Sequence, residues 1–295
     1  MKNNILVSGS HRSGSTWTGK VIAKAKGVRY VHEPFNIRIY RPYSPLKYTF
    51  EYLNGTPKSH QEEVKNYIDS FSTLFSPYNL KKLLNFNPLR DRKHALDDFN
   101  AVFADRAIIK DPIALMSAEW IDKNFDWDIV ILIRHPAAFV ASLKVKNWQF
   151  NFRQYRDQNL LMKDYMTDYS DMIDEYIEHK KDLVDQGILL WNIIHDIIAY
   201  YRQKHSNWYF VKHEDLSMDP MAEFEKMFSF LNLDFDNGVK KYIQESTSSE
   251  ARTDLTRNSI KNIKAWKRRL STKEIERIKL GANRVWPKFY SENDW

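Results

Sequence analysis

The sequence predicts an α/β protein in which three layers place helices on both sides of a parallel β-sheet. Three observations support this prediction. Short apolar runs, above all residues 128–134 (DIVILIR), are typical of strands buried in a parallel sheet. Stretches with helical spacing separate these runs, and parallel strands need such crossover connections. Polar or charged residues follow the runs, as expected at the carboxyl edge of such a sheet.

Apolar periodicity places the individual elements. Strands are predicted at residues 5–7, 28–31, 106–111, 128–134 and 208–212. Helices are predicted after Gly14 and at residues 61–84 (broken at Pro77), 114–125, 137–146, 183–204, 220–231, 235–245 and 272–285. We expect one domain over residues 1–295, with insertions at about 35–100 and 147–181 forming the acceptor side. The second insertion is predicted to be a helical cap.

Composition limits the classes of function. The chain has 295 residues, of which 43% are hydrophobic, so it can bury a substantial core. The formal net charge of +7 suits an anionic ligand but is too mild and too interspersed to indicate nucleic-acid binding. The sequence has no cysteine, which excludes disulfides and a thiol nucleophile. With no leader and no apolar run near the ~20 residues of a membrane span, we expect a cytoplasmic protein without an integral membrane segment.

A glycine-bounded loop follows the first predicted strand. Its apolar run meets Ser8, Gly9 and Ser10, and the pattern becomes helical after Gly14. In such a loop consecutive backbone N–H groups converge on an anion, and the positive end of the helix dipole points at the same place. The stretch therefore predicts a phosphate site. An ordinary strand-to-helix turn with a solvated arginine is the alternative.

The loop differs from that of an ATP-hydrolysing protein at one decisive position. Gly9 and Gly14 match the front of the Walker A pattern G-x-x-x-x-G-K-[ST], which favours a P-loop NTPase-like topology. The lysine of that pattern is replaced by Ser15, and a basic residue stands earlier, at Arg12. From there a cation reaches only the group that projects outward from a nucleotide 5'-phosphate. The loop is therefore not built for ATP hydrolysis.

Charged residues follow the other predicted strands. Because ligands bind beyond the carboxyl ends of parallel strands, we expect these residues to share one crevice with the loop. They are Glu33, Lys110 with Asp111, Arg134, and His213. Such a cationic set with one or two carboxylates suits a multiply phosphorylated ligand and a proton transfer. Arg134 with Ser142 forms a candidate second phosphate site, although a surface ion pair and a small helix residue explain the two equally well.

Four segments together resemble the sulfotransferase family. HRSGSTW (residues 11–17) is similar to its 5'-phosphosulfate loop, and RHPAAFVAS (134–142) to its 3'-phosphate element. KHEDL (212–216), after a predicted strand, is similar to the YEDL-like segment of that family, and RNSIKNIKAWKRRLS (257–271) resembles the basic C-terminal region that closes over the nucleotide. The resemblance covers residues 5 to about 270 in the expected order, and it is closer to carbohydrate-directed than to small-phenol-directed members.

The resemblance implies transfer of a sulfuryl group from 3'-phosphoadenosine 5'-phosphosulfate (PAPS), leaving adenosine 3',5'-bisphosphate (PAP), without a metal. Arg12 would contact the sulfate and the leaving 5'-phosphate, and Trp17 would stack on adenine. The remaining nucleotide ligands would be His11, Ser13, Gly14, Ser15, Thr16, Arg134, Ser142, His213, and Arg257 or Lys261. Relatives often have tyrosine at the position of His213. Many have lysine at the position of Arg12, and arginine scarcely deprotonates, so proton donation to the leaving group is in doubt.

In-line sulfuryl transfer needs a general base for the acceptor. Glu33, in an E-P step that resembles the one in carbohydrate sulfotransferases, is the first choice, with His32 second and Asp111 also open. A strand at residues 28–31 would send His32 and Glu33 to opposite sides. Lys110 is expected to help hold the acceptor or the sulfate. A Glu33–arginine ion pair with a purely structural role is the alternative.

Two other classes of function stay open. A P-loop kinase for a nucleoside or another small molecule would share the fold and the loop, but this chain has Ser15 in place of the Walker lysine that such a kinase needs. A noncatalytic nucleotide- or polyanion-binding module would bind in a strongly salt-dependent way. For the favoured hypothesis the acceptor is a carbohydrate, a glycoconjugate or another small molecule, indicated by the aromatic and basic stretches at residues 35–57 and 147–163.

Overall fold

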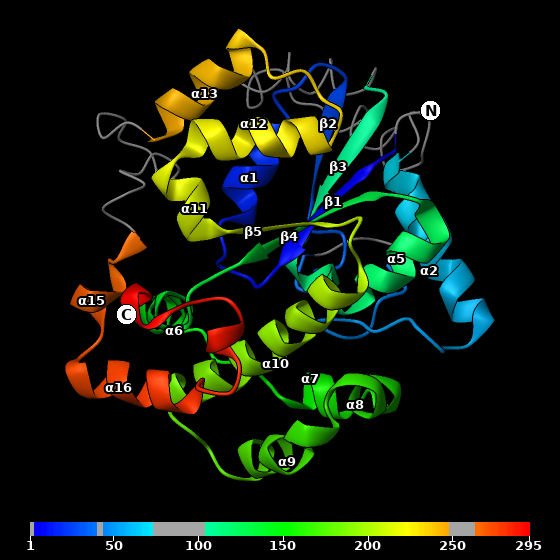
Figure 1. Cartoon of the computed structure of the whole chain (residues 1–295). Helices are drawn as coiled ribbons and strands as arrows, with labels where there is room; N and C mark the ends of the chain where they lie inside the picture. The colour runs from blue at the N-terminus through cyan, green and yellow to red at the C-terminus, as the bar shows by residue number, and fades with distance from the viewer. Residues whose placement is uncertain (1–2, 40–43, 73–103, 248–262) are drawn as a thin grey trace, which may run out of the picture. The chain divides into compact units, whose positions relative to one another are not determined.

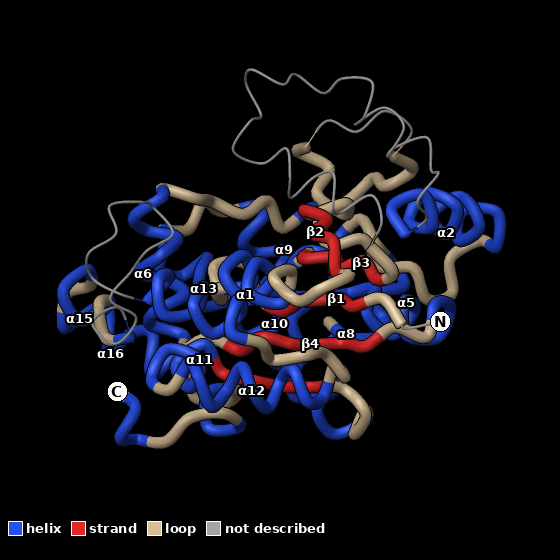
Figure 2. The backbone as a smooth tube through the Cα atoms, turned by 90° about the horizontal axis from the view of Figure 1, so that it is seen from above, coloured by secondary structure: helices blue, strands red, loops and turns tan. Residues whose placement is uncertain are grey.

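A computed structural model describes residues 3–39, 44–72, 104–247 and 263–295. It contains a five-stranded sheet with the strand order β2-β3-β1-β4-β5. The strands are β1 (Ile5–Gly9), β2 (Val28–His32), β3 (Arg106–Lys110), β4 (Asp128–Ile133) and β5 (Tyr209–Lys212). Both β1 and β2 pair with β3 in parallel. The sheet, flanked by helices, is the α/β fold with P-loop-like topology that the sequence predicts, and Figure 2 shows its strands in red.

Helices connect the strands. The α-helices are α1 (Ser15–Ile22), α2 (Lys58–Ser72), α5 (Ala118–Phe125), α6 (Pro136–Lys146), α7 (Arg153–Arg156), α8 (Asn159–Tyr165), α9 (Ser170–Glu178), α10 (Leu183–Lys204), α11 (His213–Met218), α12 (Pro220–Phe230), α13 (Asn237–Thr247), α15 (Trp266–Arg269) and α16 (Thr272–Gly281). Short 3-10 helices are η1 (Pro112–Ser117), η2 (Thr167–Tyr169), η3 (Trp286–Lys288) and η4 (Glu292–Asp294). None of the helices described is both long and apolar enough to cross a membrane.

Most predicted boundaries agree with the structure within a few residues, and three predictions need comment. The helix predicted at 114–125 is confirmed from Ala118 onward as α5, but residues 114–117 belong to the 3-10 helix η1, at whose start Asp111 accepts the N–H of Ile113. The last predicted helix ends earlier, at Gly281. Residues 73–84 of the helix predicted after residue 61 lie outside the described residues.

Contacts between Cα atoms divide the chain into two compact units. The first comprises Met1–Ser8, Ser15–Val130 and Glu225–Tyr242. Its centre is the fully buried run of β1 and β3, against which α1 and α2 pack. The pairing of Val7 with Lys110 and of Lys110 with His32 brings the carboxyl ends of three strands to the same edge.

The second unit comprises Gly9–Gly14, Ile131–Phe224 and Ile243–Trp295. Its core is α10, which is buried along most of its length and packs on α6 and α16; Figure 1 shows these three helices together. Close approach is possible because Gly187 faces Val140, and a Cβ added to this glycine would lie 3.1 Å from a Val140 methyl. The insertion predicted at 147–181 is helical, as α7, α8 and α9.

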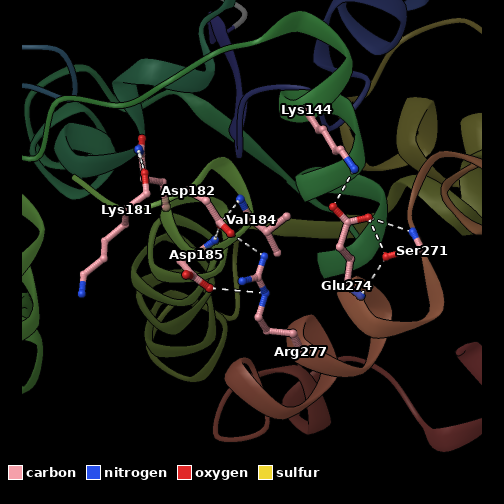
Figure 3. A network of polar contacts seen from close by, with 9 residues as sticks. Lys144, Lys181, Asp182, Val184, Asp185, Ser271, Glu274 and Arg277 are labelled. Atoms are coloured by element: carbon pink, nitrogen blue, oxygen red, sulfur yellow. Dashed lines mark hydrogen bonds and ion pairs between the residues drawn. The ribbon is translucent and has the colours of Figure 1, made fainter. Parts of the chain in front are cut away.

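Polar contacts tie α16 to two other helices of this unit (Figure 3). Arg277 lies 2.7 Å from an oxygen of Asp182 and 3.5 Å from one of Asp185, at the start of α10. Lys144, in the last turn of α6, contacts Glu274 at 2.5 Å. These contacts hold α16, which follows the predicted basic region at residues 257–271, against α10 and against α6, the helix that contains Ser142.

Candidate functional site

The loop between β1 and α1 has a backbone that only glycine permits at two positions. Gly9 has φ +134°, and a Cβ there would lie 2.3 Å from the carbonyl oxygen of Leu132. Gly14 has φ +90°, and a Cβ there would lie 2.4 Å from Nδ1 of His213. Both positions combine a backbone conformation that side chains disfavour with a close neighbour. The glycine spacing seen in the sequence therefore shapes this loop.

Two serines inside the loop have buried hydroxyl groups. Ser10 and Ser13 are fully buried, and the Oγ atom of each lacks a hydrogen-bond partner. Buried polar groups nearly always have a partner, so such a pair calls for an explanation. A phosphate, whose oxygens accept hydrogen bonds, would satisfy both hydroxyls. The loop residues thus fit the group that the sequence predicts there.

The predicted second phosphate site lies directly against the loop. Arg12 donates from Nε to Oγ of Ser142 at 2.9 Å, and Arg134 donates from Nη1 to the carbonyl oxygen of Arg12 at 3.2 Å. Arg12 itself has φ +67°, so the loop turns sharply where its side chain leaves. All three residues belong to the second unit. The guanidinium of Arg12 thus contacts the Ser142 hydroxyl, and the guanidinium of Arg134 contacts the loop backbone at Arg12, so two groups that bind anionic oxygens well are joined to the same loop.

The backbone of Arg134 is held by two side chains of α10. Because β4 ends at Ile133, its own N–H and C=O need partners elsewhere. The N–H donates to Nε2 of His195 at 3.3 Å, and the C=O accepts from Nε1 of Trp191 at 2.8 Å. Nδ1 of His195 lies 3.0 Å from the carbonyl oxygen of Trp191, which fixes the tautomer with Nε2 as acceptor. Burial lowers the pKa of His195 to about 3, so this acceptor stays neutral.

Sequence reasoning missed this pair. Trp191 and His195 are four residues apart and therefore share one face of a helix, and each is fully buried. A histidine among apolar residues of a buried helix was the available signal.

Other predicted nucleotide ligands have defined places. The ring of His11 packs against Phe139 and Trp148, with centroids 4.9 and 4.8 Å away, which anchors the loop on the second unit's core. His213 begins α11 and lies against Gly14. In the first unit, Ser15, Thr16 and Trp17 form the first turn of α1. Arg257 and Lys261 lie outside the described residues. The roles predicted for all of these stay predictions.

The candidate base, Glu33, belongs to the first unit. It follows β2 with φ +44°, and its N–H donates to the carbonyl oxygen of Lys110 at 2.9 Å. Its carboxylate accepts hydrogen bonds from Nζ of Lys110 and from Asn36, the latter at 2.7 Å. The expected structural ion pair therefore exists, but its cation is a lysine with a side chain only 1% exposed.

The surroundings of Glu33 keep its carboxyl group ionised. Burial by itself raises the pKa of Glu33, but the charge of Lys110 and the hydrogen bonds from Lys110 and Asn36 outweigh burial and bring the pKa below its ordinary value. At neutral pH Glu33 is thus a carboxylate able to accept a proton.

The two alternative bases differ from expectation. His32 and Glu33 do not point to opposite sides: their side chains approach to 4.0 Å, because β2 ends at His32 and the positive φ of Glu33 breaks the strand alternation. Half of the His32 side chain is exposed. Asp111 is fully buried, and its two oxygens accept the N–H groups of Phe35 (2.5 Å) and Ile113 (3.0 Å). Burial raises the pKa of Asp111 to about 7.

Replacing Lys110 is expected to change the pH dependence of any proton transfer to Glu33. In Lys110→Met, burial remains and the main opposing charge is gone, so the pKa of Glu33 rises. A base must be deprotonated to act, so the acid limb of the kcat/KM profile for sulfuryl transfer should move to higher pH. The exposed Lys65→Met on α2 is the control and should leave that limb in place. An unmoved limb in Lys110→Met would show that the rate does not depend on the ionisation of Glu33.

The structure defines an α/β protein of the P-loop-like class, with a glycine-bounded loop that contains Arg12 and that Arg134 contacts. The chain belongs to the sulfotransferase family, because residues 4–237 match the model of the Sulfotransferase family. No curated protein gives a significant match.

Several solved structures are similar over nearly the whole chain. The sulfotransferase domain from the olefin synthase of Synechococcus PCC 7002 is 18% identical, covering 99% of this chain and 97% of that chain with a TM-score of 0.47. The sulfotransferase domain from the curacin biosynthetic pathway is 15% identical, with coverages of 96% and 98% and a TM-score of 0.45. Mouse sulfotransferase SULT7A1 complexed with PAP is 13% identical, with coverages of 100% and 87% and a TM-score of 0.45. Membership of the family rests on the family model.

Proposed function

We propose that this protein transfers a sulfuryl group from PAPS to a hydroxyl or amine of an acceptor. The observation that carries the proposal is the contact of Arg12 with Ser142 and of Arg134 with Arg12, which supports two neighbouring phosphate sites in one unit. PAP carries phosphates at both its 5' and its 3' position, so it needs two such sites. A nucleotide with a single phosphorylated end would leave one of them without use.

The candidate site residues of the second unit have distinct roles in this proposal. The backbone of residues 9–14 and the hydroxyls of Ser10 and Ser13 bind the 5'-phosphate. Arg134 and Ser142 bind the 3'-phosphate. Bound PAPS supplies the sulfuryl group and the leaving 5'-phosphate. The guanidinium of Arg12 stabilises the negative charge that develops as the bond between sulfur and the 5'-phosphate oxygen breaks, and it supplies charge rather than a proton because arginine scarcely deprotonates.

Glu33 of the first unit is the proposed general base. As the acceptor oxygen or nitrogen bonds to sulfur, its proton passes to the Glu33 carboxylate. Lys110 holds this carboxylate ionised before the transfer. The E-P step of Glu33 and Pro34, which resembles carbohydrate-directed relatives, supports a carbohydrate or glycoconjugate as the acceptor.

Calorimetry with PAP tests the proposal. PAP is expected to bind without magnesium, at least about 10²-fold more tightly than adenosine 5'-monophosphate (AMP), because the second phosphate gains charge-assisted hydrogen bonds. Transfer from radiolabelled PAPS to a cell extract should label an acceptor.

Two outcomes would contradict the proposal. Tighter binding of Mg-ATP than of PAP would support a P-loop kinase. PAP binding that falls steeply with salt, together with no labelled product, would support a noncatalytic module.

A further inference from the structure

Glu214, on α11, joins the candidate 3'-phosphate site to the end of the chain. Its Oε1 lies 3.7 Å from Nε of Arg134 and accepts the N–H of His135 at 3.2 Å. Its Oε2 accepts the hydroxyl of Tyr290 at 2.9 Å. All four residues belong to the second unit. The Glu214 carboxylate therefore contacts both Arg134, which follows β4, and Tyr290, which lies near the end of the chain.

These contacts matter because the Glu214 side chain is only 14% exposed. Burial raises the pKa of Glu214, and the charge of Arg134 and the hydrogen bonds, including that from Tyr290, act against this rise. Burial also raises the pKa of Tyr290 well above its ordinary value, so its hydroxyl remains a hydrogen-bond donor. The Tyr290 hydroxyl therefore keeps donating to Glu214, and this hydrogen bond helps to keep Glu214 charged and paired with Arg134.

The place of Tyr290 is fixed by aromatic packing. The ring of His135 stacks on Trp266 of α15 at 5.2 Å and 9°, and it meets the rings of Tyr290 and Trp295 edge-on at 5.0 and 4.6 Å. Trp266 and Trp295 also contact each other, and Figure 1 shows the end of the chain beside α15. Tyr290, Trp266 and Trp295 all lie beyond residues 4–237, the part that matches the family model.

The guanidinium of Arg134 is consequently held at two points. Its Nε faces Glu214, and its Nη1 donates to the carbonyl oxygen of Arg12. An ion pair at 3.7 Å on one side and a hydrogen bond on the other favour one orientation of this planar group, and a set orientation is what recognition of a phosphate requires. Loss of the Glu214 carboxylate would therefore weaken the preference for this orientation.

We propose that Tyr290, through Glu214, is a positioning residue that orients Arg134 and thereby sets the preference of the site for a 3'-phosphorylated nucleotide. This inference rests on the proposed function. The segment after residue 237 then contributes to the choice of nucleotide, whereas Arg12 and Glu33 carry out the transfer. Neither Tyr290 nor Glu214 needs to touch the nucleotide.

The test is the ratio of PAP affinity to AMP affinity, measured by calorimetry without magnesium. In Tyr290→Phe the shape is kept and one hydrogen bond to a charged group is lost, so PAP affinity should fall about tenfold. AMP affinity should change less than about twofold, because AMP lacks the group that Arg134 binds. Tyr200→Phe, at an exposed tyrosine of α10, is the matched control and should leave both affinities unchanged.

A second variant and a double mutant keep the test decisive. Glu214→Gln removes the charge but keeps the size, and it should lower the same ratio. In an Arg134→Met background, Tyr290→Phe should no longer change the ratio. Equal losses for PAP and AMP, or an unchanged ratio in both Tyr290→Phe and Glu214→Gln, would overturn the inference. A wild-type protein without preference for PAP would instead contradict the proposed function.

Discussion

Glu33→Gln is expected to lower turnover by about 10²-fold or more while PAP affinity stays nearly intact. The carboxylate is kept ionised beside Lys110, and an amide of the same shape cannot take up a proton at neutral pH. Turnover should be measured with PAPS and a labelled acceptor, and PAP affinity by calorimetry. Because Arg12, Arg134 and Ser142, the proposed nucleotide ligands, lie in the other unit, PAP binding should be unaffected.

Two controls separate a catalytic loss from a structural one. The substitution leaves the buried ammonium of Lys110 beside a neutral group, which destabilises the fold to some extent. Thermal unfolding of Glu33→Gln therefore has to be recorded beside its activity. His32→Gln removes the exposed neighbour and should retain most activity. Unchanged turnover in Glu33→Gln would exclude Glu33 as the base and leave His32 or Asp111.

Arg134→Met should weaken PAP binding by about 10²-fold and AMP binding only slightly. This magnitude follows from losing the proposed charge-assisted contact with the 3'-phosphate, worth about 2–3 kcal/mol. Ser142→Ala, which removes a single hydroxyl, should weaken PAP binding by about tenfold. Calorimetry with PAP and AMP measures both effects.

The matched control for the second prediction is Arg156→Met. Arg156 forms a half-exposed ion pair with Asp174 in the helical insertion, and its loss should leave both affinities unchanged. Arg134→Met also removes the cation beside the largely buried Glu214. The pKa of Glu214 should therefore rise, and the folded state should lose some stability. Equal weakening of PAP and AMP would mean that Arg134 supports the fold and does not recognise the 3'-phosphate.

Much of the fold could be predicted because it depends on local patterns. The apolar runs place all five strands to within about two residues, and the 22 residues of α10 coincide with the predicted helix. The glycine spacing of the loop is also a local signal, because Gly9 and Gly14, separated by four residues, both have a positive φ that glycine adopts easily. The neighbours that leave no room for a side chain there, Leu132 and His213, come from distant parts of the chain. The 3-10 helix η1 was missed because a single cap at Asp111 overrides helical periodicity.

The candidate site was predictable only in part. Short-range signals placed three of its residues. The glycine-bounded loop indicated Arg12, and the end of a buried strand indicated Arg134 together with Ser142, eight residues later. The partner of Glu33 was predicted as an arginine and is Lys110, because strand pairing across the sheet selects the neighbour. The proximity of His32 and Glu33 was mispredicted because a positive φ reverses the expected direction.

The sequence by itself determined the order of strands and helices, the glycine turn and the two arginines that an anion would meet. Only the tertiary structure decided what holds Arg134: Trp191 and His195 are about 60 residues away along the chain, and Tyr290 reaches it through Glu214. Such contacts form when helices pack, because burial forces each polar group to find a partner wherever the fold brings one near. No periodicity or motif within a short segment encodes which distant residue that partner is.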